Sequence, residues 1–127
     1  MRAARPRVSG ALLLWFGLLG APAAWAVQHV AGYALTEASC NEAARAGWNV
    51  HLDAWTIVVT AAGLGVALAA GAAAIATFRR SRDAGTDPPG ARIHFLAIVA
   101  VTITPLFVCI MLMSGLGTLF LPACTQS

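Results

Sequence analysis

Residues 93–121 read IHFLAIVAVTITPLFVCIMLMSGLGTLFL and contain no Asp, Glu, Lys or Arg over 29 positions. A hydrocarbon core about 30 Å thick is crossed by about 20 apolar residues in an α-helix. Backbone amides in lipid must be satisfied within the segment, so a single span of this kind has to be helical. This stretch therefore predicts a transmembrane helix, and the rest of the chain can be compared with it.

Two further windows, 8–35 and 55–78, are also free of charged residues. The three windows hold 81 of the 127 residues, and all 13 charged residues lie outside them. Only 10% of the chain is charged, against roughly a quarter in a soluble domain. The composition excludes a soluble enzyme domain, a disordered charged tail and a nucleic-acid-binding protein. We expect an all-α integral membrane protein in contact with the lipid bilayer, with three transmembrane helices in one domain over residues 1–127.

The arginines predict the orientation of these spans. Three lie in residues 1–7 and four in residues 79–92, whereas residues 36–54 contain Arg45 alone. Loops rich in Arg stay in the cytoplasm. We therefore expect a cytoplasmic N-terminus and a cytoplasmic 79–92 loop. The 36–54 loop and the C-terminus would lie outside, in a multi-pass protein of the bacterial inner membrane.

The N-terminal window has a second interpretation. Basic residues, the apolar run ALLLWFGLLG (11–20) and the Ala24-Trp25-Ala26 sequence resemble the three parts of a signal peptide. Cleavage after Ala26 would leave two spans without changing the remaining topology. Against cleavage, the apolar run continues through residues 27–35 without a polar break. Both alternatives remain open at this point.

The three cysteines differ in their predicted locations. Cys40 follows the first window and Cys124 follows the third, so both are expected on the outer side, where disulfides persist. We expect a Cys40–Cys124 bridge that ties the outer ends of the first and third helices; two free thiols are the alternative. Cys109 lies near the middle of the third window and is expected to be a small packing residue.

The second window is rich in small residues. Gly63, Ala67 and Gly71 form one row at helical spacing, and Gly65, Ala69 and Ala73 form a second. Such rows let helix backbones approach closely in lipid. The rows predict either a tight bundle within the chain or a contact with another membrane protein, which could be a second copy.

A few polar residues in or beside the windows are candidates for chemistry. Trp25, His29 and Tyr33 follow one another at intervals of four residues and so share a helix face, which we expect to be buried. His29 would then either make an interhelical hydrogen bond or, together with His51, ligate haem or copper. The windows contain no acidic residue, and we find no nucleotide-binding or nucleophile motif. We therefore assign no catalytic residue and no cofactor, and expect no enzyme activity.

Several short stretches resemble one family: small bacterial membrane proteins often encoded beside haem-copper cytochrome c oxidase genes. The stretches are Gly20-Ala-Pro22-Ala-Ala-Trp25, His29, Tyr33-Ala-Leu35, Cys40, His51, Arg92, Phe95-Leu96-Ala97, Leu116 and Leu121-Pro122-Ala-Cys124. The resemblance implies an accessory subunit or assembly partner of a respiratory oxidase, without catalytic residues. Self-association of the chain is the further alternative.

Overall fold

The computed structural model describes residues 10–42, 51–83 and 90–121, and all regular structure in these ranges is helical. Helix α1 spans Gly10–Glu37 and passes directly into a π-helical turn, η1, at Ala38–Glu42. Helix α3 spans Leu52–Ser81, and α4 spans Gly90–Phe120. All three long helices are long and apolar enough to cross a membrane. The prediction of an all-helical chain with three such helices is confirmed.

Helical structure extends beyond the uncharged windows at several of their ends. α1 and η1 continue through Glu37 to Glu42, although residues 36–42 were predicted to lie in a loop. α3 similarly continues past Phe78 to Ser81 and includes Arg79 and Arg80. A lack of charge marks the segment that suits hydrocarbon, whereas a helix continues until its backbone hydrogen bonds end. Charged residues in the terminal turns are therefore compatible with helix that extends beyond the bilayer core.

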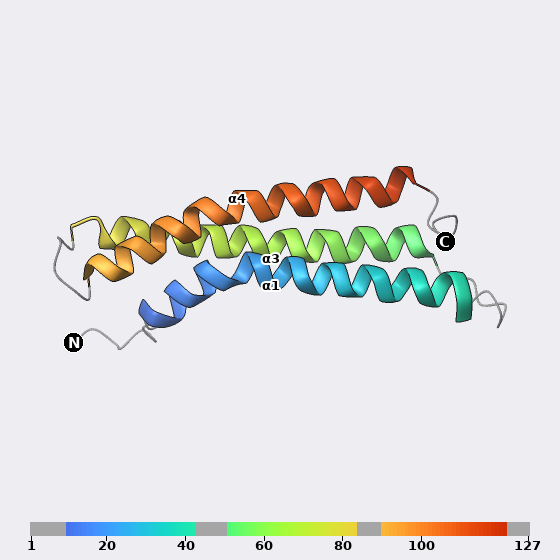
Figure 1. Cartoon of the computed structure of the whole chain (residues 1–127), viewed down its shortest axis with the longest axis horizontal. Helices are drawn as coiled ribbons and strands as arrows, with labels where there is room; N and C mark the ends of the chain where they lie inside the picture. Colours follow the sequence, from blue (N-terminus) through green and yellow to red (C-terminus); the bar gives the residue numbers. More distant parts are fainter. Residues whose placement is uncertain (1–9, 43–50, 84–89, 122–127) are drawn as a thin grey trace, which may run out of the picture.

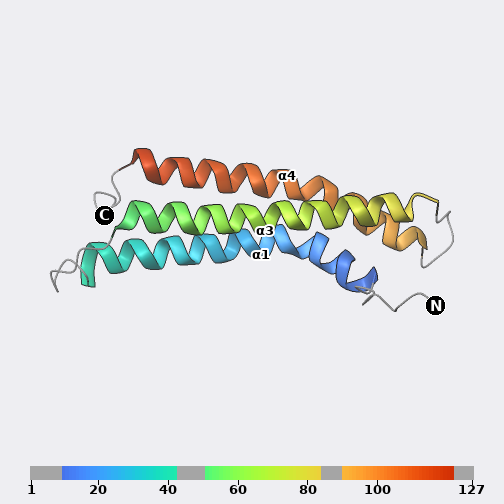
Figure 2. The ribbon, with the colours of Figure 1, turned by 180° about the vertical axis from the view of Figure 1, so that it is seen from behind.

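The three helices form an elongated bundle in which α3 packs against both of its neighbours (Figures 1 and 2). α1 and α4 run antiparallel to α3, so the start of α1, the end of α3 and the start of α4 share one end of the bundle. α1 and α4 also contact each other, less extensively than either contacts α3. This arrangement gives the bundle an Arg-rich end and, opposite, the end that contains η1.

The centre of the bundle is built from small side chains. Ala21, Ala67 and Ala97 are fully buried, and Met111 is the largest side chain to be so. Many of the large hydrophobic residues point outward instead, among them Trp15, Leu19, Val30, Phe95, Leu106 and Met113. Apolar surface has no drive to leave lipid, so membrane helices associate through close backbone approach. The distribution of side-chain size is therefore that of a bundle surrounded by lipid.

Two of the helices contain a proline: Pro22 in α1 and Pro105 in α4. Both helices change direction along their length, whereas α3 is straighter (Figure 1). Proline removes one backbone hydrogen bond and bends a helix. Near Pro105, the Thr102 and Thr104 hydroxyls donate to the carbonyls of Ile98 and Ala100, at 2.8 and 2.7 Å. These threonines thus satisfy their hydroxyl groups within α4 and need no partner from another helix.

Candidate functional site: a polar chamber, an apolar groove and an outward row of small residues

The row formed by Gly63, Ala67 and Gly71 lies inside the bundle. A Cβ atom at Gly63 would lie 2.6 Å from Met111 Cε, and one at Gly71 would lie 3.2 Å from Thr104 Cγ2. Ala67 is fully buried. This row therefore packs α3 within the chain, and it is not available as a seam for a second copy.

A matching row on α1 was missed from the sequence. A Cβ atom at Gly17 would lie 2.9 Å from the backbone nitrogen of Ala74, and one at Gly20 would lie 2.6 Å from Ala70 Cβ. Ala24 continues this side of α1 and is buried. The spacing of three to four residues between these small residues was the sequence signal. These contacts are the closest approach of the α1 and α3 backbones among the described glycines.

The second row on α3 is divided between the inside and the outside. Ala73 is buried, whereas Gly65 and Ala69 are exposed. No heavy atom lies within 4 Å of a Cβ built on Gly65. Ala61 and Ala72 are also exposed at helical spacing from them. We call Ala61, Gly65, Ala69 and Ala72 the outward row, because nothing in the described part of the chain covers it.

The prediction that Trp25, His29 and Tyr33 form a buried stripe is wrong. Tyr33 is 68% exposed, His29 is exposed and Trp25 is half-buried. The His29 ring stacks on Trp25, with ring centroids 5.6 Å apart, and Trp25 also packs against Phe107. The neighbouring Gln28 is the buried polar residue instead, because the small face of α1 that meets α3 continues through its position.

Gln28 is only 6% exposed and makes one hydrogen bond to α3. Its Nε2 donates to Thr60 Oγ1 at 3.1 Å. Its Oε1 is buried without a hydrogen-bond partner among the described residues. Buried polar groups nearly always have a partner, so an unpaired acceptor at such a position requires an explanation. Gln28 is the residue on which the site centres.

A cavity of ≈260 Å³ lies beside Gln28, between all three helices, toward the end of the bundle that contains η1. Its lining includes His29, Tyr33 and the hydroxyl residues Thr36, Thr56, Thr60, Ser114 and Thr118. We call this cavity the polar chamber. Its lining contains no Asp, Glu, Lys or Arg, so hydroxyl, amide and imidazole groups supply its chemistry.

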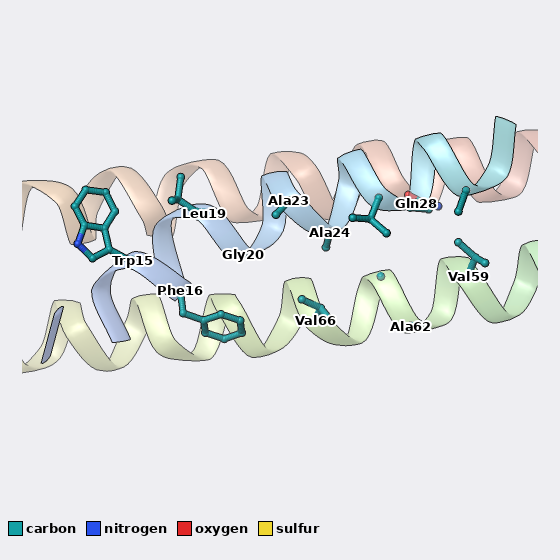
Figure 3. Close-up of a pocket in the computed structure, with 13 residues that line it drawn as sticks. Trp15, Phe16, Leu19, Gly20, Ala23, Ala24, Gln28, Val59, Ala62 and Val66 are labelled. Carbon is teal, nitrogen blue, oxygen red and sulfur yellow. The ribbon is translucent and has the colours of Figure 1, made fainter. Parts of the chain in front are cut away.

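An apolar groove of ≈590 Å³ adjoins the chamber and follows the α1–α3 boundary. Gln28 and Val59 line both cavities. Figure 3 shows Gln28 and Val59 toward one end of the groove, with Trp15 and Phe16 toward the other. Small residues such as Gly20 and Ala62 lie between them. The α1 lining runs from Trp15 to Ala31, which is about 24 Å at 1.5 Å per residue.

At the opposite end, α3 and α4 are joined by a polar contact. Ser81 Oγ and His94 Nδ1 lie 2.9 Å apart, and the His94 ring stacks on Phe78 with centroids 5.1 Å apart. Ser81 Oγ also donates to the Phe78 carbonyl at 3.1 Å. This cluster fixes the start of α4 against the end of α3.

The cysteines take different environments. Cys40 lies half-buried in η1. Cys124 lies outside the described residues, so the Cys40–Cys124 pairing stays a prediction. Cys109 is a free thiol and exposed, so the small packing residue predicted at this position is not packed within the bundle. It lies on the outer face of α4, next to the exposed Ile110.

The two histidines proposed as ligands are found at the same end of the bundle. His29 lines the polar chamber, and His51 is the exposed N-cap residue of α3. The described residues contain no group of three or more His, Cys, Asp or Glu side chains that could hold a metal ion.

Comparisons with protein-family models, with curated proteins and with solved structures found no match to this chain. The outward row, the polar chamber and the apolar groove are therefore the structural features from which a function can be inferred.

Proposed function

We propose that this chain is a non-catalytic accessory subunit or assembly partner of a bacterial inner-membrane complex, with a respiratory haem-copper oxidase as the favoured complex. The observation that carries the proposal is the outward row on α3. α3 is the central helix of the bundle, yet one of its faces exposes Gly65 with open space around its Cβ position. The choice of an oxidase rests on the sequence resemblance alone.

The outward row differs from the other exposed surfaces. α1 and α4 expose bulky side chains such as Val30, Phe95 and Leu106, which suit contact with acyl chains. The outward row is small, and Val58 and Leu68 flank it with larger exposed side chains. Small residues between larger ones form a shallow groove along which a second helix can approach closely. The expected occupant is therefore a transmembrane helix of the larger complex.

The test is recovery of the complex after gentle extraction from native membranes. Tagged wild-type chain is expected to co-purify with the oxidase subunits in fixed stoichiometry. Gly65→Leu should reduce that recovery about tenfold, because its side chain fills the space that the partner helix needs. A tenfold loss corresponds to about 1.4 kcal/mol of binding free energy, within the range of about 1–3 kcal/mol for overpacking.

The matched control is Gly117→Leu on α4. Gly117 also has no heavy atom within 4 Å of a built Cβ, so the same substitution is made at an equally open position on another helix. Recovery should remain at the wild-type level. Equal recovery of the two variants would refute docking through the outward row. A wild-type chain found only as a monomer or a homo-oligomer would refute the subunit proposal.

A further inference from the structure

We propose that the polar chamber and the apolar groove together bind one uncharged membrane amphiphile. Its head group would donate hydroxyl hydrogen bonds in the chamber, and its single long chain would lie in the groove between α1 and α3. This inference is independent of the outward row, because the groove opens on a different face of α3, lined by Val59, Ala62 and Val66.

The unpaired Gln28 Oε1 indicates what the head group must supply. The other end of the amide is already bonded to Thr60, so the carboxamide is fixed in place where the two cavities meet, and its oxygen lacks a donor. If the amide were rotated by 180°, its oxygen would face Thr60 in place of its nitrogen. That oxygen would then have a partner only if the Thr60 hydroxyl turned to donate to it. In the observed arrangement, a ligand hydroxyl is the group that completes the site.

The remaining chamber residues reinforce this preference for donors. The Thr36 and Thr118 hydroxyls already donate to the backbone carbonyls of Gly32 and Gly115, at 2.9 and 2.8 Å. A hydroxyl that has given its proton to a carbonyl offers lone pairs to a ligand. The chamber therefore presents several acceptors. It also contains no Asp, Glu, Lys or Arg, so it offers no carboxylate to an ammonium head group and no guanidinium or amino group to a phosphate.

The groove determines the other half of the ligand. It is lined almost entirely by apolar and small side chains, and it continues from the chamber at Gln28 and Val59 to Trp15 and Phe16. Its length of about 24 Å along α1 suits an extended hydrocarbon or prenyl chain. The polar chamber lies toward one end of the bundle, and the groove runs from it through the middle to Trp15, near the start of α1, so that a head group in the chamber would have its chain directed into the bilayer.

Two kinds of membrane molecule combine an uncharged head group that bears hydroxyls with a long apolar chain. They are a neutral glycerolipid with free hydroxyls and a reduced prenylated quinone. We would measure binding to the purified full-length chain by native mass spectrometry, using a monoacylglycerol and a prenylated hydroquinone as separate probes. Preferential binding of one probe identifies the source. For either probe, methylating the head-group hydroxyls should weaken binding to the wild type about tenfold, since one buried hydrogen bond is lost.

Three variants test the placement of the ligand. Gln28→Leu should bind the free probe more weakly and should reduce the difference in binding between the free and methylated probes, because one of the chamber's acceptors is removed. Ala62→Phe should abolish binding by filling the groove, since Ala62 lies in its lining. Ala34→Phe is the matched control: Ala34 is exposed on α1 and lies outside the lining of both cavities, so this variant should bind as the wild type does.

Other results would overturn the inference. Equal binding of free and methylated probes to the wild type would mean that water, and not a ligand, satisfies Gln28. Unchanged binding in Ala62→Phe would place the chain outside the groove. A dimer that dissociates in Ala62→Phe, without bound amphiphile in the wild type, would show that a helix of a second copy occupies the groove. Loss of binding with intact recovery of a larger complex would leave the proposed function standing.

Discussion

Gly17→Leu is expected to separate α1 from α3 and to lower the free energy of unfolding by about 3 kcal/mol, the upper end of the usual cost of overpacking. Even a single Cβ atom at this position would lie 2.9 Å from the nitrogen and 3.0 Å from the Cα of Ala74. Both are backbone atoms, so no rotamer change can make room. The two helices would have to move apart along the small-residue contact between them.

The contact opposite Gly63 is closer than the one opposite Gly17, but it is easier to relieve. A Cβ atom at Gly63 would be even closer to its neighbour, at 2.6 Å, but that neighbour is the terminal Cε of Met111. A methionine side chain is flexible and can change rotamer. Gly63→Ala should therefore cost less than Gly17→Ala, even though its shortest distance is smaller.

The measurement is reversible unfolding of the purified chain in mixed micelles, followed by circular dichroism or by a pair of labels on α1 and α3. Gly117→Leu serves as the control, since its Cβ position is open, and should unfold as the wild type does. If Gly17→Leu and Gly117→Leu proved equally stable, the close α1–α3 contact would not hold the bundle together.

The number and approximate location of the helices could be predicted because charge is so unevenly distributed. Arg79 and Arg92 bound uncharged segments, and no other structure can carry such segments through lipid. The helix ends could not be predicted in the same way. Glu37 and Glu42 are charged, yet helical structure continues through both of them.

Which side of each helix faces inward was much harder to predict. Each span is apolar on all sides, so there is little contrast between a core face and a lipid face. Gln28 and His29 are adjacent polar residues, and hydropathy alone does not distinguish them. The structure buries Gln28 and exposes His29 because the Gly17–Ala24 side of α1 fits against α3. Residue size, more than polarity, determined the packing.

For the same reason, the sequence does not determine which of the two small-residue rows on α3 packs inside the bundle. Gly63 and Gly65 both lie at helical spacing from other small residues, so either could face a neighbour. α3 presents Gly63 to Met111 and leaves Gly65 open. A sequence predicts that such rows are used for close packing, but the partner depends on how the helices rotate against one another.

The second large effect is expected when arginines are removed, because they set the orientation of the bundle in the membrane. Their removal should change the side of the membrane on which the C-terminus lies. The ends of α1, α3 and α4 that adjoin the Arg-rich segments lie together (Figure 1). Arg79, Arg80, Arg82 and Arg92 are exposed there, where anionic head groups can reach them. Each Arg near such a surface contributes on the order of 1 kcal/mol. Seven arginines on this side against Arg45 on the other should hold the C-terminus outside.

A reporter fused after Ser127 tests this orientation. Alkaline phosphatase, which is active only outside the cytoplasm, should be active on the wild type, and a green fluorescent protein fusion should be dark. Replacing the four exposed arginines of residues 79–92 by Gln should preserve this result, since three basic residues remain near the N-terminus. Replacing all seven should give mixed or inverted chains, because only Arg45 then remains. Arg45→Gln is the control and should keep the wild-type orientation. A fluorescent C-terminal fusion of the wild-type chain would show that the arginine distribution does not set the topology, and the polar chamber would then face the cytoplasmic leaflet.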